Sequence, residues 1–89
     1  MNDFRKFERV LKAIGNRRRL AILSYLKKHS EGTVGELAEI LRLSFKATSK
    51  HLAVLYAAEL VEREQRSLQM WYSLSSSPHR ITDYVLRLL

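Results

Sequence analysis

The chain has 89 residues, of which 46% are hydrophobic, and sixteen lysines and arginines outnumber nine aspartates and glutamates to give a formal net charge of +7. This length corresponds to one domain, and the basic excess points to a polyanionic partner, either nucleic acid or a membrane surface. Cysteine is absent, which excludes disulfides and thiolate metal sites.

The distribution of the charges favours DNA over a membrane. A membrane-bound helix concentrates basic residues opposite one broad apolar face, whereas here they are spread over several predicted elements. The first residues lack the apolar core of a signal peptide, and no apolar run approaches membrane-spanning length. We therefore expect a cytoplasmic protein with no membrane partner.

The first predicted helix covers residues 3–14. Its apolar residues recur at intervals of three and four, and they are Phe4, Phe7, Leu11 and Ile14. Gly15 is well placed to end the helix. This stripe either covers the core of the domain itself or packs against a second subunit.

Asn16 is expected to cap a second helix, which extends to a short loop at residues 30–32. Its first turn contains Arg17, Arg18 and Arg19, where the helix dipole disfavours positive charge by about 0.3–1 kcal/mol. Arginines placed against that cost are either phosphate contacts or part of a solvated terminus. Arg17 and Arg18 are the candidate phosphate contacts.

A helix-turn-helix is predicted over residues 33–60. Thr33 and Glu36 have the spacing of a capping box, in which each side chain accepts a hydrogen bond from the other residue's backbone N–H. Ser44 is a suitable cap for the next helix, which extends to about Glu59.

Viewed down its axis, this next helix has two distinct sides. The side expected to be buried carries Phe45, Thr48, Leu52, Leu55 and Tyr56. The opposite side carries Lys46, Ala47, Lys50, Ala53 and Ala57. Small residues allow close approach and lysines favour a negative surface, as in the major groove of DNA, although a plain solvated face has the same composition.

Residues 61–74 predict a β-hairpin, the wing, with strands at 61–65 and 69–74. Arg63 and Arg66 are expected near its tip, where they either contact phosphates or are solvated. The tip lacks glycine, which predicts a short or irregular hairpin.

Residues 78–89 predict a final helix, with Ser77 as its cap and Pro78 at its first position. Its apolar stripe consists of Ile81, Tyr84, Val85 and Leu88. A terminal helix frays unless it is docked, so this stripe requires a packing partner. His79 and Asp83 lie one turn apart and, with their symmetry mates, are a possible interfacial metal site.

No catalytic constellation is visible in the sequence. The three histidines, His29, His51 and His79, fall in different predicted elements, and no glycine-rich loop is present to hold a phosphate. We expect no enzymatic activity, no cofactor and no small-molecule substrate.

The sequence of the helix-turn-helix resembles the arsenic-repressor (ArsR-like) family of transcriptional regulators. The resemblance is carried by residues 37–44 and 49–55, and it extends upstream over 13–23 and downstream to 71–74. It covers about residues 11–74.

The resemblance implies a mainly α-helical winged helix-turn-helix fold, in which residues 1–89 form a single domain with five helices and a β-hairpin wing before the last helix. The first and last helices are expected to form a homodimer through Phe4, Phe7, Leu11, Ile81, Tyr84, Val85 and Leu88. The expected DNA contacts are Ser44, Phe45, Lys46, Ala47, Ser49, Lys50, His51, Arg63, Arg66, Arg17 and Arg18.

Three features depart from the family pattern. Arg42 stands where the family has a glycine in a left-handed conformation, at a cost of about 1 kcal/mol. Phe45 replaces a polar residue that contacts bases, and either packs inward or touches a thymine methyl group. The final helix is shorter than in the family's zinc sensors, so we expect no metal.

The sequence therefore predicts a homodimeric repressor that binds double-stranded DNA at an inverted repeat. Two other functions stay open at this stage. One is a winged-helix module that binds an acidic protein, and the other is an architectural protein that binds DNA without sequence preference.

Overall fold

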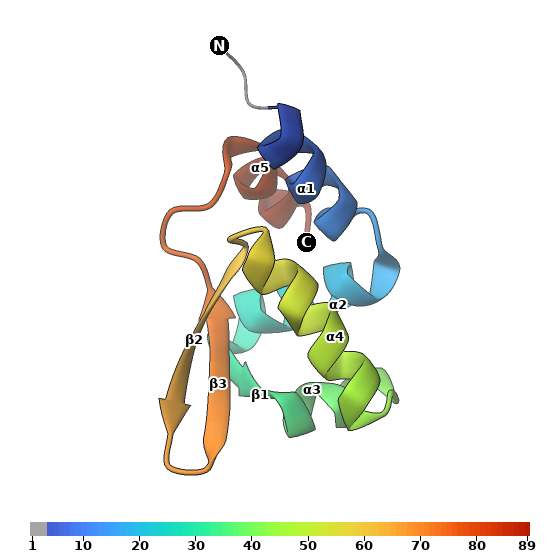
Figure 1. Cartoon of the computed structure of the whole chain (residues 1–89), viewed down its shortest axis with the longest axis vertical. Helices are drawn as coiled ribbons and strands as arrows, with labels where there is room; N and C mark the ends of the chain where they lie inside the picture. The colour runs from blue at the N-terminus through green and yellow to red at the C-terminus, as the bar shows by residue number, and fades with distance from the viewer. Residues whose placement is uncertain (1–3) are drawn as a thin grey trace.

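The computed structural model describes residues 4–89, so Asp3, the first residue of the first predicted helix, lies outside the described residues. The elements in chain order are α1 (Phe4–Ile14), α2 (Arg17–His29), β1 (Glu31–Thr33), α3 (Val34–Leu41), α4 (Phe45–Ala57), β2 (Val61–Arg66), β3 (Gln69–Leu74) and α5 (Arg80–Leu88). Figure 1 shows α1 and α5 at one end and the tip of the β2–β3 wing at the other. The predicted winged helix-turn-helix is confirmed.

Local caps fix the two helices of the helix-turn-helix. The Thr33 hydroxyl accepts from the Glu36 backbone N–H at 3.2 Å, and the Glu36 carboxylate accepts from the Thr33 backbone N–H at 2.9 Å. At the start of α4 the Ser44 hydroxyl accepts from the Ala47 N–H at 3.0 Å. Each cap satisfies backbone donors that the helix leaves without partners, so both predicted helix starts are confirmed.

The turn between α3 and α4 is left-handed, as predicted. Arg42 has φ 56° and ψ 43°, and its N–H bonds back to the last turn of α3.

The helix α4 ends at Ala57, two residues before the predicted end, and Glu59 follows with φ 62°. A residue in this conformation cannot continue a right-handed helix.

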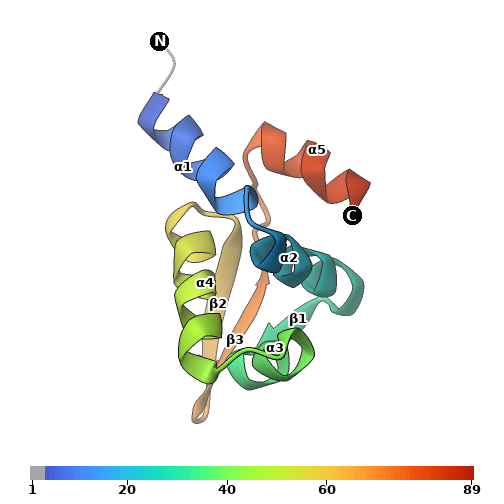
Figure 2. The same ribbon diagram turned by 90° about the vertical axis from the view of Figure 1, so that its right-hand side faces the viewer.

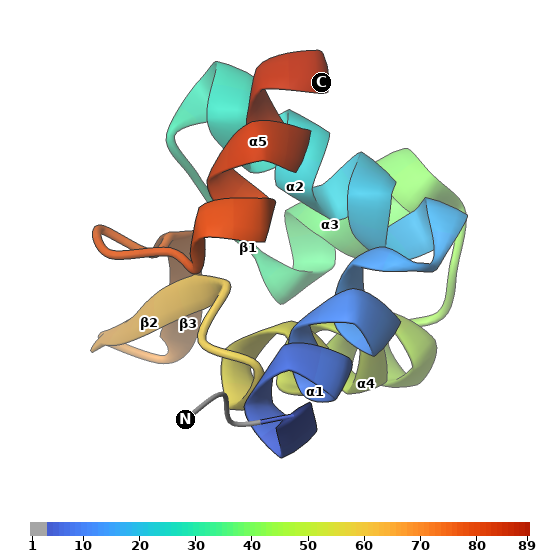
Figure 3. The ribbon, with the colours of Figure 1, turned by 90° about the horizontal axis from the view of Figure 1, so that it is seen from above.

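The core lies where α2, α3 and α4 meet the sheet. Its largest fully buried aliphatic side chains are Val10, Ile22, Leu23, Leu26, Leu37, Leu52, Leu55 and Leu60. Burial of one such side chain contributes about 1.5–3 kcal/mol. From above, α1 lies beside α4 whereas α5 covers α2 (Figure 3). None of the helices formed by residues 4–89 has the length and apolarity needed to span a bilayer.

The predicted loop at residues 30–32 is wrong, because Glu31–Thr33 forms the edge strand β1. It pairs antiparallel with β3, with Glu31 opposite Ser73, and the sheet order is β1-β3-β2. There is little room for a side chain at Gly32, since a Cβ there would lie 3.1 Å from a Tyr25 ring carbon. Three residues are too few to show strand periodicity, and the pairing comes from a distant segment.

The wing is regular rather than short or irregular. Its strands pair without interruption from Val61–Leu74 to Arg66–Gln69. Ser67 supplies the left-handed residue of the two-residue turn with φ 56°, in place of a glycine. Tyr72 lies in the core and Met70 and Leu74 pack against it, so the predicted inward face of β3 is confirmed. The outward face is less distinct, because Trp71 and Ser73 are half-buried as well.

The helix α5 begins two residues later than predicted. His79 is its cap, and the His79 Nδ1 accepts from the Ile81 N–H at 3.1 Å, so Pro78 lies outside the helix. Histidine is not among the common capping residues, which is why the sequence pattern favoured Ser77. At the other end the Lys27 ammonium donates to the Leu86 carbonyl at 2.7 Å and fastens α5 to α2.

The left-handed turn gives a stability prediction. Arg42→Gly should raise the free energy of unfolding by about 0.5 kcal/mol, because glycine removes the steric cost at φ 56° while adding freedom to the unfolded chain. Glu39→Gly, in the exposed middle of α3, is the control and should lower it by about 0.5–1 kcal/mol. Urea unfolding measures both, and equal losses in the two variants would contradict the prediction.

Candidate nucleic-acid interface

The outer face of α4 is accessible along its length. Ser44, Lys46, Lys50, Ala53 and Ala57 are exposed, and Ala47, Ser49 and His51 are half-buried. The inner face buries Thr48, Leu52 and Leu55 against the core. The small and basic side predicted from the sequence is therefore the side that a ligand can approach.

Two residues predicted for the buried side of α4 are exposed. Phe45 is 64% exposed and Tyr56 is 41% exposed. Phe45 is the first residue of the helix and is exposed, although it lies seven residues, about two turns, before the fully buried Leu52 and so points in nearly the same direction. A helical projection gives the direction of a side chain but not the depth of the core beneath it.

Tyr56 instead supports Arg63 of the wing. The Arg63 guanidinium carbon lies 3.9 Å from the centroid of the Tyr56 ring, a cation–π contact between β2 and the last turn of α4. Arg63 pairs with Tyr72 in the middle of β2, so its predicted position near the wing tip is wrong. The contact holds a positive charge beside the last turn of α4.

Arg66 is held within the wing by carboxylates. Its guanidinium forms two bonds to Glu31, at 2.7 and 3.0 Å, and one to Glu64 at 2.6 Å. It also lies 5.2 Å above the Trp71 ring. The hydrogen bonds from Arg66 lower the pKa of Glu31, so the carboxylate stays charged. These contacts favour a role for Arg66 in fastening β2 to β1, and they do not support the predicted phosphate contact.

The three arginines at the start of α2 point in different directions. Arg17 and Arg18 are exposed, as expected for phosphate contacts. Arg19 turns inward: its Nε donates to the Ala13 carbonyl at 2.7 Å and its Nη2 to the Lys12 carbonyl at 2.8 Å. Arg19 therefore satisfies two of the carbonyls that the end of α1 leaves without partners.

The same guanidinium reaches α4. Arg19 Nη1 lies 3.3 Å from His51 Nδ1. Because a guanidinium only donates, Nδ1 must accept, and the proton of the neutral ring lies on Nε2. Partial burial and the nearby charges of Arg19 and Arg18 lower the pKa of His51. The lowered pKa favours the neutral ring, which offers one N–H donor.

Sequence reasoning passed over Arg19, although a signal was present. Ile22, Leu23 and Leu26 follow it by three, four and seven residues, the spacing of one helix face, and all three are fully buried. That spacing separates Arg19 from Arg17 and Arg18 and directs it toward the core.

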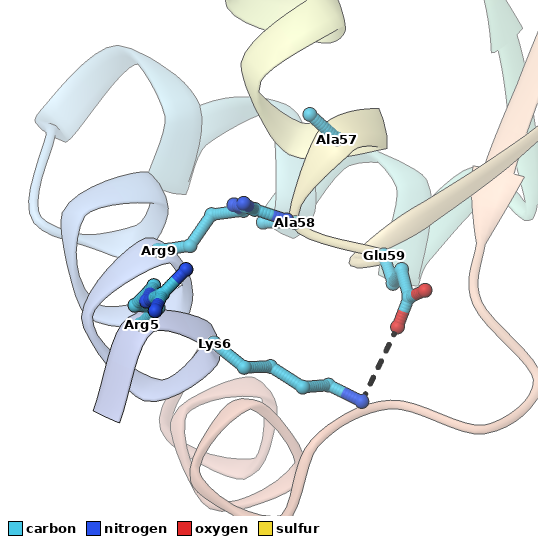
Figure 4. Close-up of a pocket in the computed structure, with 6 residues that line it drawn as sticks. All are labelled: Arg5, Lys6, Arg9, Ala57, Ala58 and Glu59. Atoms are coloured by element: carbon cyan, nitrogen blue, oxygen red, sulfur yellow. Dashed lines mark ion pairs between the residues drawn. The ribbon is translucent and has the colours of Figure 1, made fainter. Parts of the chain in front are cut away.

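A second contact joins α1 to the far end of α4. Figure 4 shows Arg5, Lys6 and Arg9 facing the end of α4 across a pocket of about 440 Å³. Lys6 Nζ lies 3.5 Å from the Glu59 carboxylate. Positive charge beside a helix C-terminus is favourable, so this cluster stabilises the end of α4.

The helices α1 and α5 leave apolar side chains exposed at one end of the domain. Phe4 is 74% exposed, and Phe7, Leu11, Tyr84 and Leu88 are also exposed. The core side of α1 is formed instead by Val10, Ala13 and Ile14. Ile81 and Val85 are half-buried against the core of the same chain, so only part of the predicted α5 stripe is available to a partner.

His79 is occupied by other contacts. Its Nδ1 caps α5, and its ring lies 5.4 Å from the Phe7 ring. Across residues 4–89 the structure contains no group of three or more side chains arranged as metal ligands.

Comparison with known proteins identifies the family. Residues 16–63, which include α2 through α4 and the start of β2, match the family described as "Bacterial regulatory protein, arsR family". The chain belongs to the arsR family. The resemblance expected from the sequence is confirmed.

Curated members of the arsR family include several similar sequences. The transcriptional activator HlyU of Vibrio cholerae is 44% identical over 68 residues, 76% of this chain and 62% of HlyU. The arsenical resistance operon repressor of Bacillus subtilis is 31% identical over 80% of this chain and 68% of that protein. The chain thus spans about two thirds of the length of these relatives.

Solved structures of the arsR family share the fold. HlyU from Vibrio cholerae superposes with a TM-score of 0.79 at 38% identity, over 93% of this chain and 86% of HlyU. Mb0332 from Mycobacterium bovis, described as a homodimeric winged helix-turn-helix DNA-binding domain, superposes with a TM-score of 0.80 at 26% identity. That superposition covers 96% of this chain and 75% of the Mb0332 domain.

The contacts of Arg19 predict that neighbouring arginines differ in their effect on stability. Arg19→Ala should lower the free energy of unfolding by about 2 kcal/mol, because two carbonyls and His51 lose their donor. Arg17→Ala removes the same charge from an exposed position and should change the free energy of unfolding by less than about 0.5 kcal/mol. Urea unfolding of both variants tests this, and similar losses would mean that the Arg19 contacts contribute nothing specific.

Proposed function

We propose that this chain is a homodimeric transcriptional regulator that binds double-stranded DNA at an inverted repeat and represses by occupying that site. The observation that carries the proposal is the outer face of α4. It combines lysines with small polar residues, is capped at its leading end by Ser44, and belongs to the helix-turn-helix of an arsR-family chain. The second helix of this motif enters the major groove.

The recognition surface is the set of side chains that we assign to DNA. It consists of Ser44, Phe45, Lys46, Ala47, Ser49, Lys50 and His51 from α4 and its cap, with Arg17, Arg18 and Arg63 beside them. The exposed arginines and Arg63 suit phosphate contact, which sets register, whereas α4 supplies base contacts, which set specificity. Lys50 is the first candidate for a base or phosphate contact.

A two-fold dimer through α1 and α5 would cover the apolar side chains that the domain exposes there. An exposed stripe that includes Phe4, Phe7 and Leu11 is costly in water and is typical of an interface. In support, the related Mycobacterium bovis domain is described as homodimeric. The two recognition helices of such a dimer would enter successive major grooves, which requires an inverted repeat.

The relatives' names include both an activator and a repressor. We favour repression because occupancy of an operator needs nothing beyond DNA binding. A regulator of this kind acts where bacterial DNA lies, in the cytoplasm, and requires no catalysis.

Lys50 provides a test of the recognition surface. On a duplex recovered by selection, Lys50→Ala should weaken binding by roughly 1–3 kcal/mol per half-site if Lys50 contacts a base. The affinity of the wild-type protein should also fall steeply with salt, since neutralised phosphates release counterions. Fluorescence anisotropy at several salt concentrations measures both effects.

Lys28→Ala is the matched control, because Lys28 is exposed in the last turn of α2. Figure 2 shows this end of α2 on the side away from α4. It removes the same charge and should leave the affinity within about twofold. Equal losses for both lysines would show that only net charge matters and would remove Lys50 from the site. Binding that is insensitive to salt would favour the acidic-protein partner instead of DNA.

Leu11 tests the dimer. Leu11→Glu should weaken dimerisation about ten- to a hundredfold, because burial of a leucine contributes about 1.5–3 kcal/mol. Leu68→Glu makes the same change at the wing tip, where Leu68 is 96% exposed and far from α1, and should leave the dimer intact. Sedimentation equilibrium distinguishes the two, and an unchanged dimer in Leu11→Glu would argue against the α1 interface.

A further inference from the structure

Phe45 is an aromatic side chain in an unusual place. It is the first residue of α4, immediately after the Ser44 cap, and 64% of it is exposed. The cap bond from the Ala47 N–H to Ser44 fixes this turn, so the ring projects from a rigid support. The leading residues of a recognition helix are the ones that contact base edges.

The chemistry of the ring limits what it can contact there. A phenyl ring neither donates nor accepts a conventional hydrogen bond, so placing it against the polar edge of guanine, cytosine or adenine would leave base groups without partners. The apolar group on the major-groove edge of the four bases is the thymine C5-methyl. Contact with that methyl removes apolar surface from water on both sides.

The polar neighbours of Phe45 agree with this assignment. Ser49 lies one turn further along on the same side of α4, and Lys46 and Lys50 lie on the adjoining outer face, so groups that suit phosphates and polar base edges occupy the same exposed turns as the ring. A lone aromatic among such groups suits one apolar spot on an otherwise polar and anionic surface. An extended apolar protein interface would instead need apolar neighbours on the same face.

We propose that Phe45 reads the C5-methyl of a thymine in each half-site of the operator. This inference rests on the proposed function and narrows it, because it names a base that the operator must contain. It further requires that 5-methylcytosine, which carries a methyl at the same position, be accepted in place of that thymine better than cytosine is.

The test uses the 89-residue protein and an operator duplex recovered by selection from random DNA. Each thymine is replaced in turn by deoxyuridine, which removes only the methyl. At one position per half-site the wild type should lose about fourfold in affinity, or about fifteenfold when both half-sites are changed, as expected for one buried methyl. Phe45→Ala should bind the thymine and uracil duplexes equally well.

Val54→Ala is the matched control, since Val54 is another exposed apolar residue of α4 and its truncation should leave the discrimination intact. Phe45→Leu keeps an apolar side chain and should retain part of the discrimination between thymine and uracil. Circular dichroism checks that each variant is folded. If Phe45→Ala does not fold, the comparison of Phe45→Leu with the wild type decides.

Two outcomes would overturn the inference while leaving the proposed function standing. One is a wild-type protein that binds its operator specifically but is indifferent to uracil at every position. The other is a Phe45→Ala variant that keeps the full discrimination. If selection yields no preferred sequence at all, the proposed function itself fails, and Phe45 has no base to read.

Discussion

The hydrogen bonds of Arg19 are the constraint on which the arrangement of this domain depends. One guanidinium closes the last carbonyls of α1, stands in the first turn of α2 and holds His51 of α4. Through α2, these bonds connect α1, which carries exposed apolar side chains, to α4, which carries Lys46 and Lys50. Lys6 of α1 forms a second contact, with Glu59 just beyond the end of α4.

The basic residues of the domain differ in whether neighbouring carboxylates neutralise them. In the wing, Arg66 is balanced by Glu31 and Glu64, so the wing tip adds little positive potential. Arg63 is held instead against Tyr56, beside α4. Lys46 and Lys50 of α4 and Arg17 and Arg18 of α2 are exposed instead. Other basic residues are spread over α1, the end of α2 and α5, so the net charge of +7 adds a long-range attraction for an anion.

Local features of the fold could be predicted from the sequence, and non-local ones could not. The caps at Thr33 and Ser44 depend on residues three positions away, so their spacing was sufficient. The strand β1 and the ion pair of Arg66 both depend on Glu31 meeting segments far along the chain. The exposure of Phe45 depends on where the core ends, which periodicity does not report. The candidate site was therefore predicted on α4 but only partly on the wing.

The central claim is that two copies of α4 read an inverted repeat. Selection of bound duplexes from a random DNA library at physiological salt, followed by sequencing, tests it most directly. We expect enrichment of an inverted repeat whose half-sites lie about one helical turn, roughly 10–10.5 base pairs, apart. Failure to enrich any sequence, while the protein is folded and dimeric, would contradict it.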